Sequence, residues 1–232
     1  ARAAEGVALR STLPEAQIYV LEGVSSSSLA TLRTQNLCPV LNSVEQCILW
    51  SPSDLPAALQ LDTGMARLGL STEEIALVLR DHAIDVRLLL SHFARADELE
   101  HDFTQSQTDR VIGVYTELLR RRPGLRLSLN NSAACVGGIV LAAGIQQLGR
   151  AGIGLYGGNP LATGRAGDVG LRPVASVFGQ ILQVRNLKAG TPVGYGGTYT
   201  ATADERVMIV GVGYADGVPR LLSNQGHVFV QG

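Results

Sequence analysis

The sequence predicts an α/β protein: a (β/α)8 barrel of the TIM type with about six of its eight βα units present, followed by a mostly antiparallel β domain. Short apolar runs alternate with amphipathic helical patterns up to about residue 158, and each run ends in polar residues or glycine. From about residue 173 the helical periodicity stops. A barrel brings all such strand ends to one mouth, whereas an open doubly wound sheet uses only those at its switch point. Because no phosphate-type glycine turn marks a switch point, the barrel is favoured.

Six apolar runs are predicted to be the barrel strands, because apolar runs separated by helices are typical of parallel strands buried on both faces. They are residues 16–22, 38–43, 57–64, 86–94, 126–132 and 151–157. Between them, residues 72–82 and 105–121 carry apolar side chains at helical spacing and are predicted helices. Thr72 and Glu74 supply an N-terminal signal for the first of these helices.

The remaining sequence predicts antiparallel strands, because short β-rich runs are separated by glycine-containing turns. The runs are 174–184, 192–199, 206–213 and 227–231. The glycine-containing stretch 159–171 is a predicted linker, and we expect two domains, 1–165 and 166–232.

The chain starts with ARAAEG, which resembles the end of a helix, and it lacks an initiating Met. We therefore interpret the sequence as a fragment of a longer protein.

Composition excludes several functional classes. The chain has 232 residues, a formal net charge of -1 and 17% charged residues, which argues against nucleic-acid binding and against disorder. No apolar run is long enough to span a membrane, and the N-terminus does not resemble a signal peptide. Three scattered cysteines are too few for a disulfide scaffold and favour a reducing, cytoplasmic location. The histidines and cysteines lack metal-ligand spacing, so no metal site is expected.

Several residues at predicted strand ends could carry chemistry, although each also has a simpler interpretation. His92 follows a buried strand and could be catalytic or structural. Arg67 follows a glycine turn and could bind an anion or be a surface charge. Asn131 and Ser132 precede a small-residue helix, where they could bind an anion or cap the helix.

Two further candidates lie later in the chain. Arg150 is the last charge before an apolar segment in which Gly152 allows close approach of the backbone to a ligand. Tyr214 lies in GYADG at the end of a β-rich run, and its simpler interpretation is an aromatic strand end. Each of these signals is weak on its own.

Taken together, seven segments resemble the alanine racemases and occur in that family's order. They are LDTGMARLGL (61–70), SHFARADE (91–98), NSAA (131–134), RAGIGLYGGNPL (150–161), LRPV (171–174), LKAGTPVGYGGTYTA (187–201) and GYADGVPR (213–220). The pairing of GYADG with DTGM-x-R-LG is specific, and the resemblance covers nearly the whole chain. It implies a PLP (pyridoxal 5'-phosphate) binding barrel at 1–165 and racemisation of L- and D-alanine. It also implies a supply of D-alanine for peptidoglycan, and a homodimer with shared active sites.

The resemblance assigns a role to each candidate. Tyr214 would be one of two acid/base residues, reaching into the partner subunit's barrel, and His92 would hydrogen-bond its phenol. Arg150 would contact His92 and the pyridine nitrogen, and Arg67 would lie near the cofactor's phenolic oxygen and the substrate carboxylate. The phosphate site would be lined by Asn131, Ser132, Gly152 and Ile153.

The chain departs from the family pattern in two places. Gln60 stands where many relatives carry a carbamylated lysine, so a neutral amide would have to orient Arg67. The sole lysine, Lys188, lies in a turn of the β domain, so the lysine that binds the cofactor covalently is missing from this sequence. Two alternatives therefore stay open: a non-catalytic remnant or dimerising module, and a racemase of serine or of a broader range of amino acids.

Overall fold

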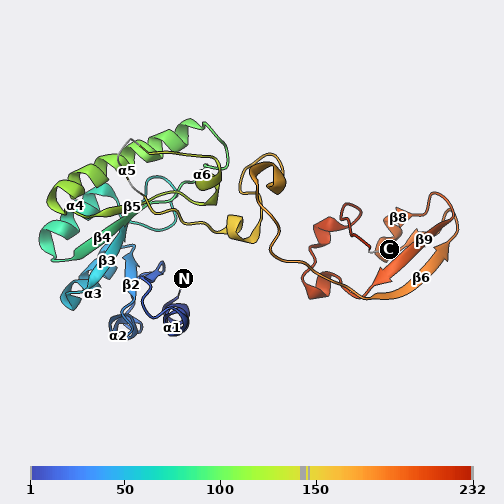
Figure 1. Ribbon diagram of the computed structural model, residues 1–232, viewed down its shortest axis with the longest axis horizontal. Helices are drawn as coiled ribbons and strands as arrows, with labels where there is room; N and C mark the ends of the chain where they lie inside the picture. The colour runs from blue at the N-terminus through green and yellow to red at the C-terminus, as the bar shows by residue number, and fades with distance from the viewer. Residues whose placement is uncertain (1, 142–144, 146, 231–232) are drawn as a thin grey trace. The chain divides into compact units, whose positions relative to one another are not determined.

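The chain folds into two compact units, which we call the first unit, Ala1–Val174, and the second unit, Ala175–Gly232 (Figure 1). The structure is a computed structural model that describes residues 2–141, 145 and 147–230. Across these residues no helix is both long and apolar enough to cross a bilayer.

The first unit contains a five-stranded parallel sheet in which the strands follow one another in chain order. The strands are β1 (Tyr19–Val20), β2 (Cys38–Leu41), β3 (Pro56–Gln60), β4 (Asp85–Leu90) and β5 (Arg126–Ser128). The helices are α1 (Ala3–Thr12), α2 (Leu29–Thr34), α3 (Val44–Trp50), α4 (Thr72–Asp81), α5 (Asp102–Arg121) and α6 (Ser132–Val136). Sequential order is the order of a barrel, whereas a doubly wound sheet reverses direction at its switch point. The predicted barrel architecture is therefore confirmed.

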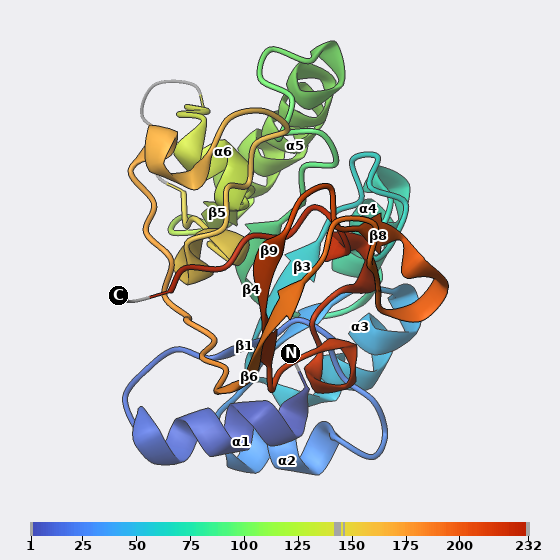
Figure 2. The same ribbon diagram turned by 90° about the vertical axis from the view of Figure 1, so that its right-hand side faces the viewer.

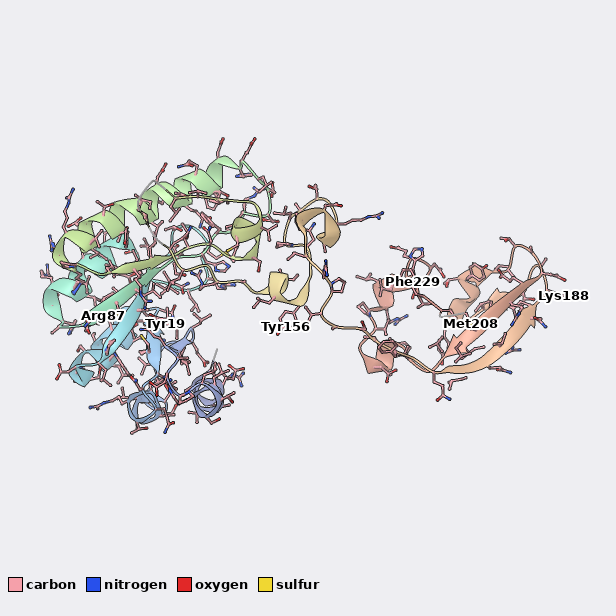
Figure 3. The ribbon with its side chains drawn as sticks, in the orientation of Figure 1. Tyr19, Arg87, Tyr156, Lys188, Met208 and Phe229 are labelled. Atoms are coloured by element: carbon pink, nitrogen blue, oxygen red, sulfur yellow. The ribbon has the colours of Figure 1, made fainter. Side chains whose placement is uncertain are left out.

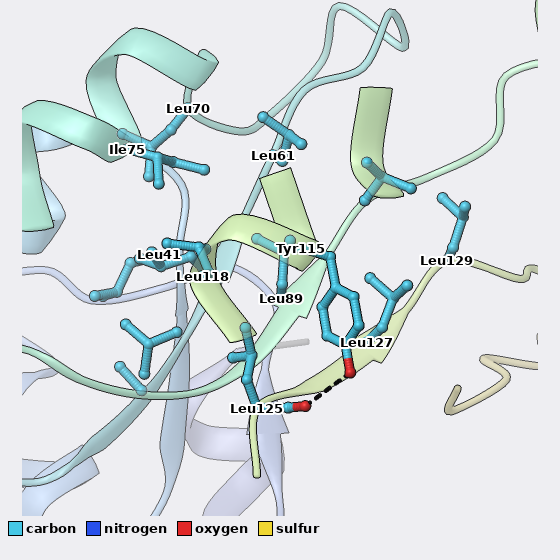
Figure 4. Packing of buried hydrophobic residues seen from close by; sticks show 14 of the residues in the cluster. Leu41, Leu61, Leu70, Ile75, Leu89, Tyr115, Leu118, Leu125, Leu127 and Leu129 are labelled. Atoms are coloured by element: carbon cyan, nitrogen blue, oxygen red, sulfur yellow. Dashed lines mark hydrogen bonds between the residues drawn. The ribbon is translucent and has the colours of Figure 1, made fainter. Parts of the chain in front are cut away.

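The two faces of the sheet bury different residues. On the outer face, Leu89 and Leu127 pack with Ile75 of α4 and with Tyr115 of α5, whose hydroxyl donates to the Leu125 carbonyl at 3.0 Å (Figure 4). The inner face holds a separate apolar cluster, which consists of Val40, Ala58, Leu88 and Leu90 with Tyr19 packed against it. Figure 2 shows α1 to α5 following one another around the outside of the strands.

A hydrogen bond on the inner face shows that the sheet curls. Arg126 on β5 donates to the Tyr19 hydroxyl on β1 at 2.6 Å (Tyr19 is labelled in Figure 3). These two strands lie at opposite ends of the five-stranded order, so a flat sheet would hold them several strand spacings of about 4.8 Å apart. The contact requires the curvature of a barrel wall.

The two helices predicted from periodicity are present. Ser71 caps α4, since its hydroxyl accepts the Glu74 N–H at 3.1 Å while the Glu74 carboxylate accepts the Ser71 N–H at 2.8 Å. The residue that caps the helix is therefore Ser71, one position before the Thr72 that the sequence pattern indicated. The α5 helix begins three residues before the predicted start, and His101 caps it by accepting the Phe103 N–H through Nδ1.

The segment 151–157, expected to be a strand, is not one. It forms a 3-10 helix at Ile153–Tyr156 that ends at Gly157, whose φ of +77° favours glycine. The Ser132 hydroxyl accepts the N–H groups of Gly152 and Gly154, so these groups do not enter a β ladder. In the described residues, the position next to β5 holds a single parallel bridge between Leu127 and Gln147.

The second unit is built from antiparallel pairs, as expected. Strand β6 (Ile181–Leu187) pairs with β9 (Glu205–Val210), and β7 (Pro192–Val193) pairs with β8 (Tyr199–Thr200). The expected runs at 174–180 and 227–230 form no ladder with the described residues, and residue 231 lies outside them. The predicted linker contains one short 3-10 helix, Ala166–Val169.

Candidate active site

The candidate site is built around a contact between His92 and Arg150 at the carboxyl end of β4. Arg150 Nη2 lies 3.2 Å from His92 Nδ1 and donates to the Ser91 carbonyl at 2.6 Å, while Nη1 donates to the Ser128 hydroxyl. A guanidinium has no acceptor, so Nδ1 must accept this hydrogen bond. The neutral imidazole therefore carries its proton on Nε2 and can donate from there.

The electrostatics of the pair favour this protonation state. Burial lowers the pKa of His92 to about 4, and the positive charges of Arg150 and Arg67 act in the same direction. Burial also lowers the pKa of Arg150 to about 10, so the guanidinium keeps its proton at neutral pH. The site thus combines a neutral histidine with a permanent cation.

A tight loop after β3 presents Arg67. One Asp62 carboxylate oxygen, Oδ1, accepts three successive N–H groups, those of Gly64 at 2.8 Å, Met65 at 2.9 Å and Ala66 at 3.2 Å. Arg67 is exposed, and its charge acts on both His92 and Arg150. This three-fold acceptor was not among the residues predicted to be functional.

Gln60 lies at the base of the same loop. Its side-chain amide donates to the Leu68 carbonyl at 3.1 Å, and its own carbonyl accepts the Leu70 N–H at 2.8 Å. Leu68 directly follows Arg67, so the neutral amide holds the loop through its backbone. This contact differs from the expected one, a direct orientation of the guanidinium.

A buried polar network joins the two loops. The Gln107 side chain of α5 accepts the Ala94 N–H at 2.9 Å and donates to the His92 carbonyl at 2.9 Å and to the Thr63 hydroxyl at 3.0 Å. The Thr63 hydroxyl also lies 2.8 Å from that of Ser91. Sequence reasoning missed Gln107. Its signal was its place on the buried stripe of α5, four residues before Val111.

The four predicted phosphate-site residues come together at α6. Asn131 caps this short helix, since its Oδ1 accepts the Ala134 N–H at 3.0 Å, which is the simpler of its two interpretations. The Ser132 hydroxyl accepts the Gly152 N–H at 2.7 Å and so brings the 3-10 turn against the helix start. Ile153 begins that turn and is 56% exposed.

The second unit contains Tyr214, which was predicted to be functional, and Lys188, the sole lysine, which was not. Tyr214 begins a 3-10 helix, Tyr214–Asp216, is 64% exposed, and has the Arg220 guanidinium 5.9 Å from its ring centroid. Lys188 forms an exposed ion pair with Asp204 in the turn after β6 (Lys188 is labelled in Figure 3). The first unit contains no lysine in its sequence.

The arrangement in the first unit is suited to binding an anionic ligand at the carboxyl ends of parallel strands. Arg67 and Arg150 supply positive charge, and the start of α6 adds hydroxyl and N–H groups. His92 offers a donor that remains uncharged at neutral pH. Such a site can hold an anion and hydrogen-bond a group that exchanges a proton.

Comparison with known proteins identifies the family of the chain. Residues 1–160 match the family model for the alanine racemase N-terminal domain, and residues 174–232 match the model for the C-terminal domain. The catabolic alanine racemase of Agrobacterium fabrum is 37% identical over 240 residues, which are 98% of this chain and 59% of that protein. An alanine racemase of Brucella suis is 37% identical over 247 residues, covering 97% of this chain and 60% of that protein.

Solved structures lead to the same family. The biosynthetic alanine racemase from Pseudomonas aeruginosa superimposes with a TM-score of 0.80 at 35% identity, covering 94% of this chain and 61% of that one. Alanine racemase from Bartonella henselae with covalently bound pyridoxal phosphate gives a TM-score of 0.74 at 29% identity, covering 96% and 62%. The chain therefore spans about three fifths of the length of the relatives it matches.

Proposed function

The chain belongs to the alanine racemase family, and from this premise we propose that the protein interconverts L- and D-alanine with PLP as its cofactor. The observation that carries the proposal is the hydrogen bond between Arg150 and His92 at the mouth of a curled parallel sheet. In this proposal residues 1–165 bind the cofactor and 166–232 form the β domain. The protein acts in the cytoplasm as a homodimer with shared active sites and supplies D-alanine for peptidoglycan.

The residues present fit the two ends of the cofactor. Ser132 and the turn that begins at Gly152 and Ile153 meet at the start of α6, and Asn131 holds the helix start. The Gly152 N–H is donated to the Ser132 hydroxyl, which keeps its own proton to donate to a phosphate. Arg150 uses three of its five N–H groups on Ser128, Ser91 and His92. Further N–H groups are left to donate to a ring nitrogen.

The cofactor, when bound, supplies an electron sink that makes the Cα proton of the amino acid removable. Arg150 would donate to the ring nitrogen and keep its own proton, because its pKa stays near 10. By leaving that nitrogen unprotonated, Arg150 would favour return of a proton to Cα over transamination. Arg67 binds the substrate carboxylate from the loop that Asp62 organises.

Proton transfer on one face of Cα is assigned to Tyr214 of a second copy of the chain. A free phenol has a pKa near 10 and needs a hydrogen-bond donor to act as a base near neutral pH. His92 is such a donor, since Arg150 occupies Nδ1 and leaves the proton on Nε2. The imidazole orients the phenol and stabilises its charged form.

The covalent attachment of the cofactor is not assigned to Lys188. Its ammonium is held by Asp204 in an exposed turn of the second unit, and it is the sole lysine of the 232 residues. Attachment therefore has to be tested in the full-length gene product.

The test is the intact mass of the full-length protein after incubation with PLP and reduction with borohydride, together with an assay of D-alanine formed from L-alanine. We expect one reduced pyridoxyl phosphate per chain and racemisation, both unchanged in a Lys188→Arg control. A protein with neither adduct nor racemisation would be a non-catalytic remnant. Loss of the adduct in the Lys188→Arg control would overturn the statement about Lys188.

A further inference from the structure

Gln107 is an uncharged side chain with no exposed surface, placed between α5 and the ends of β3 and β4. Both donor hydrogens of its amide nitrogen are engaged, one by the His92 carbonyl and one by the Thr63 hydroxyl. Its amide oxygen accepts the Ala94 N–H. A buried amide with three good hydrogen bonds holds its partners in one geometry.

Two of these bonds clamp the backbone directly after the His92 side chain. The His92 carbonyl and the Ala94 N–H both bind the same amide at 2.9 Å, which fixes the chain as it leaves β4. His92 must hold its orientation for Nδ1 to accept from Arg150 and for Nε2 to face a partner. The amide of Gln107 thus fixes the backbone from which the imidazole projects, without touching the ring.

The third bond reaches the other loop. Thr63 follows Asp62 at the base of the segment that presents Arg67, and its hydroxyl contacts both Gln107 and Ser91. Arg110, one turn further along α5, donates to the Thr63 carbonyl at 2.9 Å. One helix therefore holds the His92 loop and the Arg67 loop at a fixed spacing.

We propose that Gln107 is a positioning residue of the racemase site, setting the orientation of His92 and its spacing from the Arg67 loop. It acts through Thr63 and the backbone around His92. The effect of Gln107 on racemisation rests on the proposed function, whereas its effect on the His92 imidazole does not. The competing explanation is that Gln107 only stabilises the fold.

Four variants separate these explanations. Gln107→Met keeps the length of the side chain and removes all three bonds, and Thr63→Val removes one hydroxyl at constant shape. Val111→Ala, one turn along the same buried stripe, removes packing alone. Gln105→Met is the matched exposed control, since Gln105 bonds only Asp109 of its own helix among the described contacts.

The readout is the titration of the His92 ring in the cofactor-free full-length protein, followed by NMR with labelled histidine. The His92→Gln variant assigns the signal. In Gln107→Met the loop is released and water reaches the ring, so we expect the midpoint to rise by about one pH unit. We expect a smaller rise in Thr63→Val, and none in Val111→Ala or Gln105→Met, although Val111→Ala melts at a lower temperature.

The kinetic readout applies to the cofactor-loaded enzyme. We expect Gln107→Met to lower kcat for alanine at least tenfold, whereas Val111→Ala leaves kcat within about twofold of the wild type. An unchanged His92 midpoint in Gln107→Met, or an equal rise in Val111→Ala, would overturn the proposal. Should Gln107→Met fail to fold, an unchanged midpoint in Thr63→Val would overturn it as well. Because the titration needs neither cofactor nor racemisation, its failure is distinguishable from failure of the proposed function.

Discussion

Arg150 reaches Nδ1 of His92 at 3.2 Å from a position 58 residues further along the chain. The contact joins the end of β4 to the segment after the Gln147 bridge, and it decides which ring nitrogen carries the proton. The protonation of the imidazole thus depends on a residue that reaches it only through the tertiary fold.

His92 makes the stability of the first unit depend on pH. Its pKa is lowered from 6.5 to about 4 in the native state, so between these values the unfolded state binds a proton that the native state does not. The native state is therefore at its full stability above pH 6.5, and it loses stability relative to the unfolded state as the pH falls towards 4. We expect His92 to account for a loss of about 1 kcal/mol in the free energy of unfolding between pH 7 and 4.5, because solvent screens this partly exposed ring and reduces the full linkage value.

The measurement is urea unfolding at both pH values, followed by the fluorescence of Trp50, the sole tryptophan, which is buried in the first unit. His92→Gln removes this titration and leaves the other three histidines in place. The stability gap between the wild type and this variant should therefore change with pH. A gap that stays constant would contradict the lowered pKa.

Asp62→Ala should loosen the loop that carries Arg67, because three N–H groups lose their shared acceptor. We expect a loss of about 1–2 kcal/mol in stability and a rise of several fold in KM for alanine. Asp62→Asn keeps one acceptor oxygen and should cost less on both measures. Equal effects of the two substitutions would show that the negative charge, rather than the loop geometry, is what matters.

Gly157 and Gly170 form a matched pair that tests the loop beside the proposed phosphate site. Each ends a 3-10 helix with a positive φ, of +77° and +73°. A Cβ on Gly157 would lie 2.0 Å from the Arg172 carbonyl oxygen, whereas a Cβ on Gly170 meets nothing within 4 Å.

Gly170→Ala should therefore cost only the backbone strain, about 1 kcal/mol, and leave PLP affinity unchanged. Gly157→Ala should cost more and weaken PLP binding at least tenfold, since the turn that starts at Ile153 must move. Thermal melting and a PLP titration measure both effects. Similar PLP affinities in the two variants would contradict a phosphate site at this turn.

Tyr214→Phe should impair racemisation of one enantiomer far more than of the other, because the phenol serves one face of Cα. The measurement is uptake of solvent deuterium at Cα, starting from each enantiomer separately. Tyr195→Phe is the control, since Tyr195 also lies in the second unit and is 94% exposed. Small and equal effects in both directions would remove Tyr214 from the acid/base role.

The sequence predicted the parts of the fold that depend on local pattern. Parallel strands and the helix at 72–82 follow from apolar periodicity, which reports directly on the buried face. The turn at 153–156 was missed because it depends on the Ser132 hydroxyl, which captures two N–H groups from a segment 20 and 22 residues away. Gln107 was missed for the same reason, since a polar residue on a buried stripe shows its importance only with its partners in place.

The bond between Arg126 and Tyr19 has a consequence for how the chain folds. The two residues are 107 positions apart, so this contact cannot form on a ribosome until the intervening helices and strands have been synthesised. Closing so long a loop costs more conformational entropy than pairing two neighbouring strands, which are joined by a shorter segment. We therefore expect the bending of the sheet into a barrel wall to be completed late in folding, after the outer helices have begun to pack.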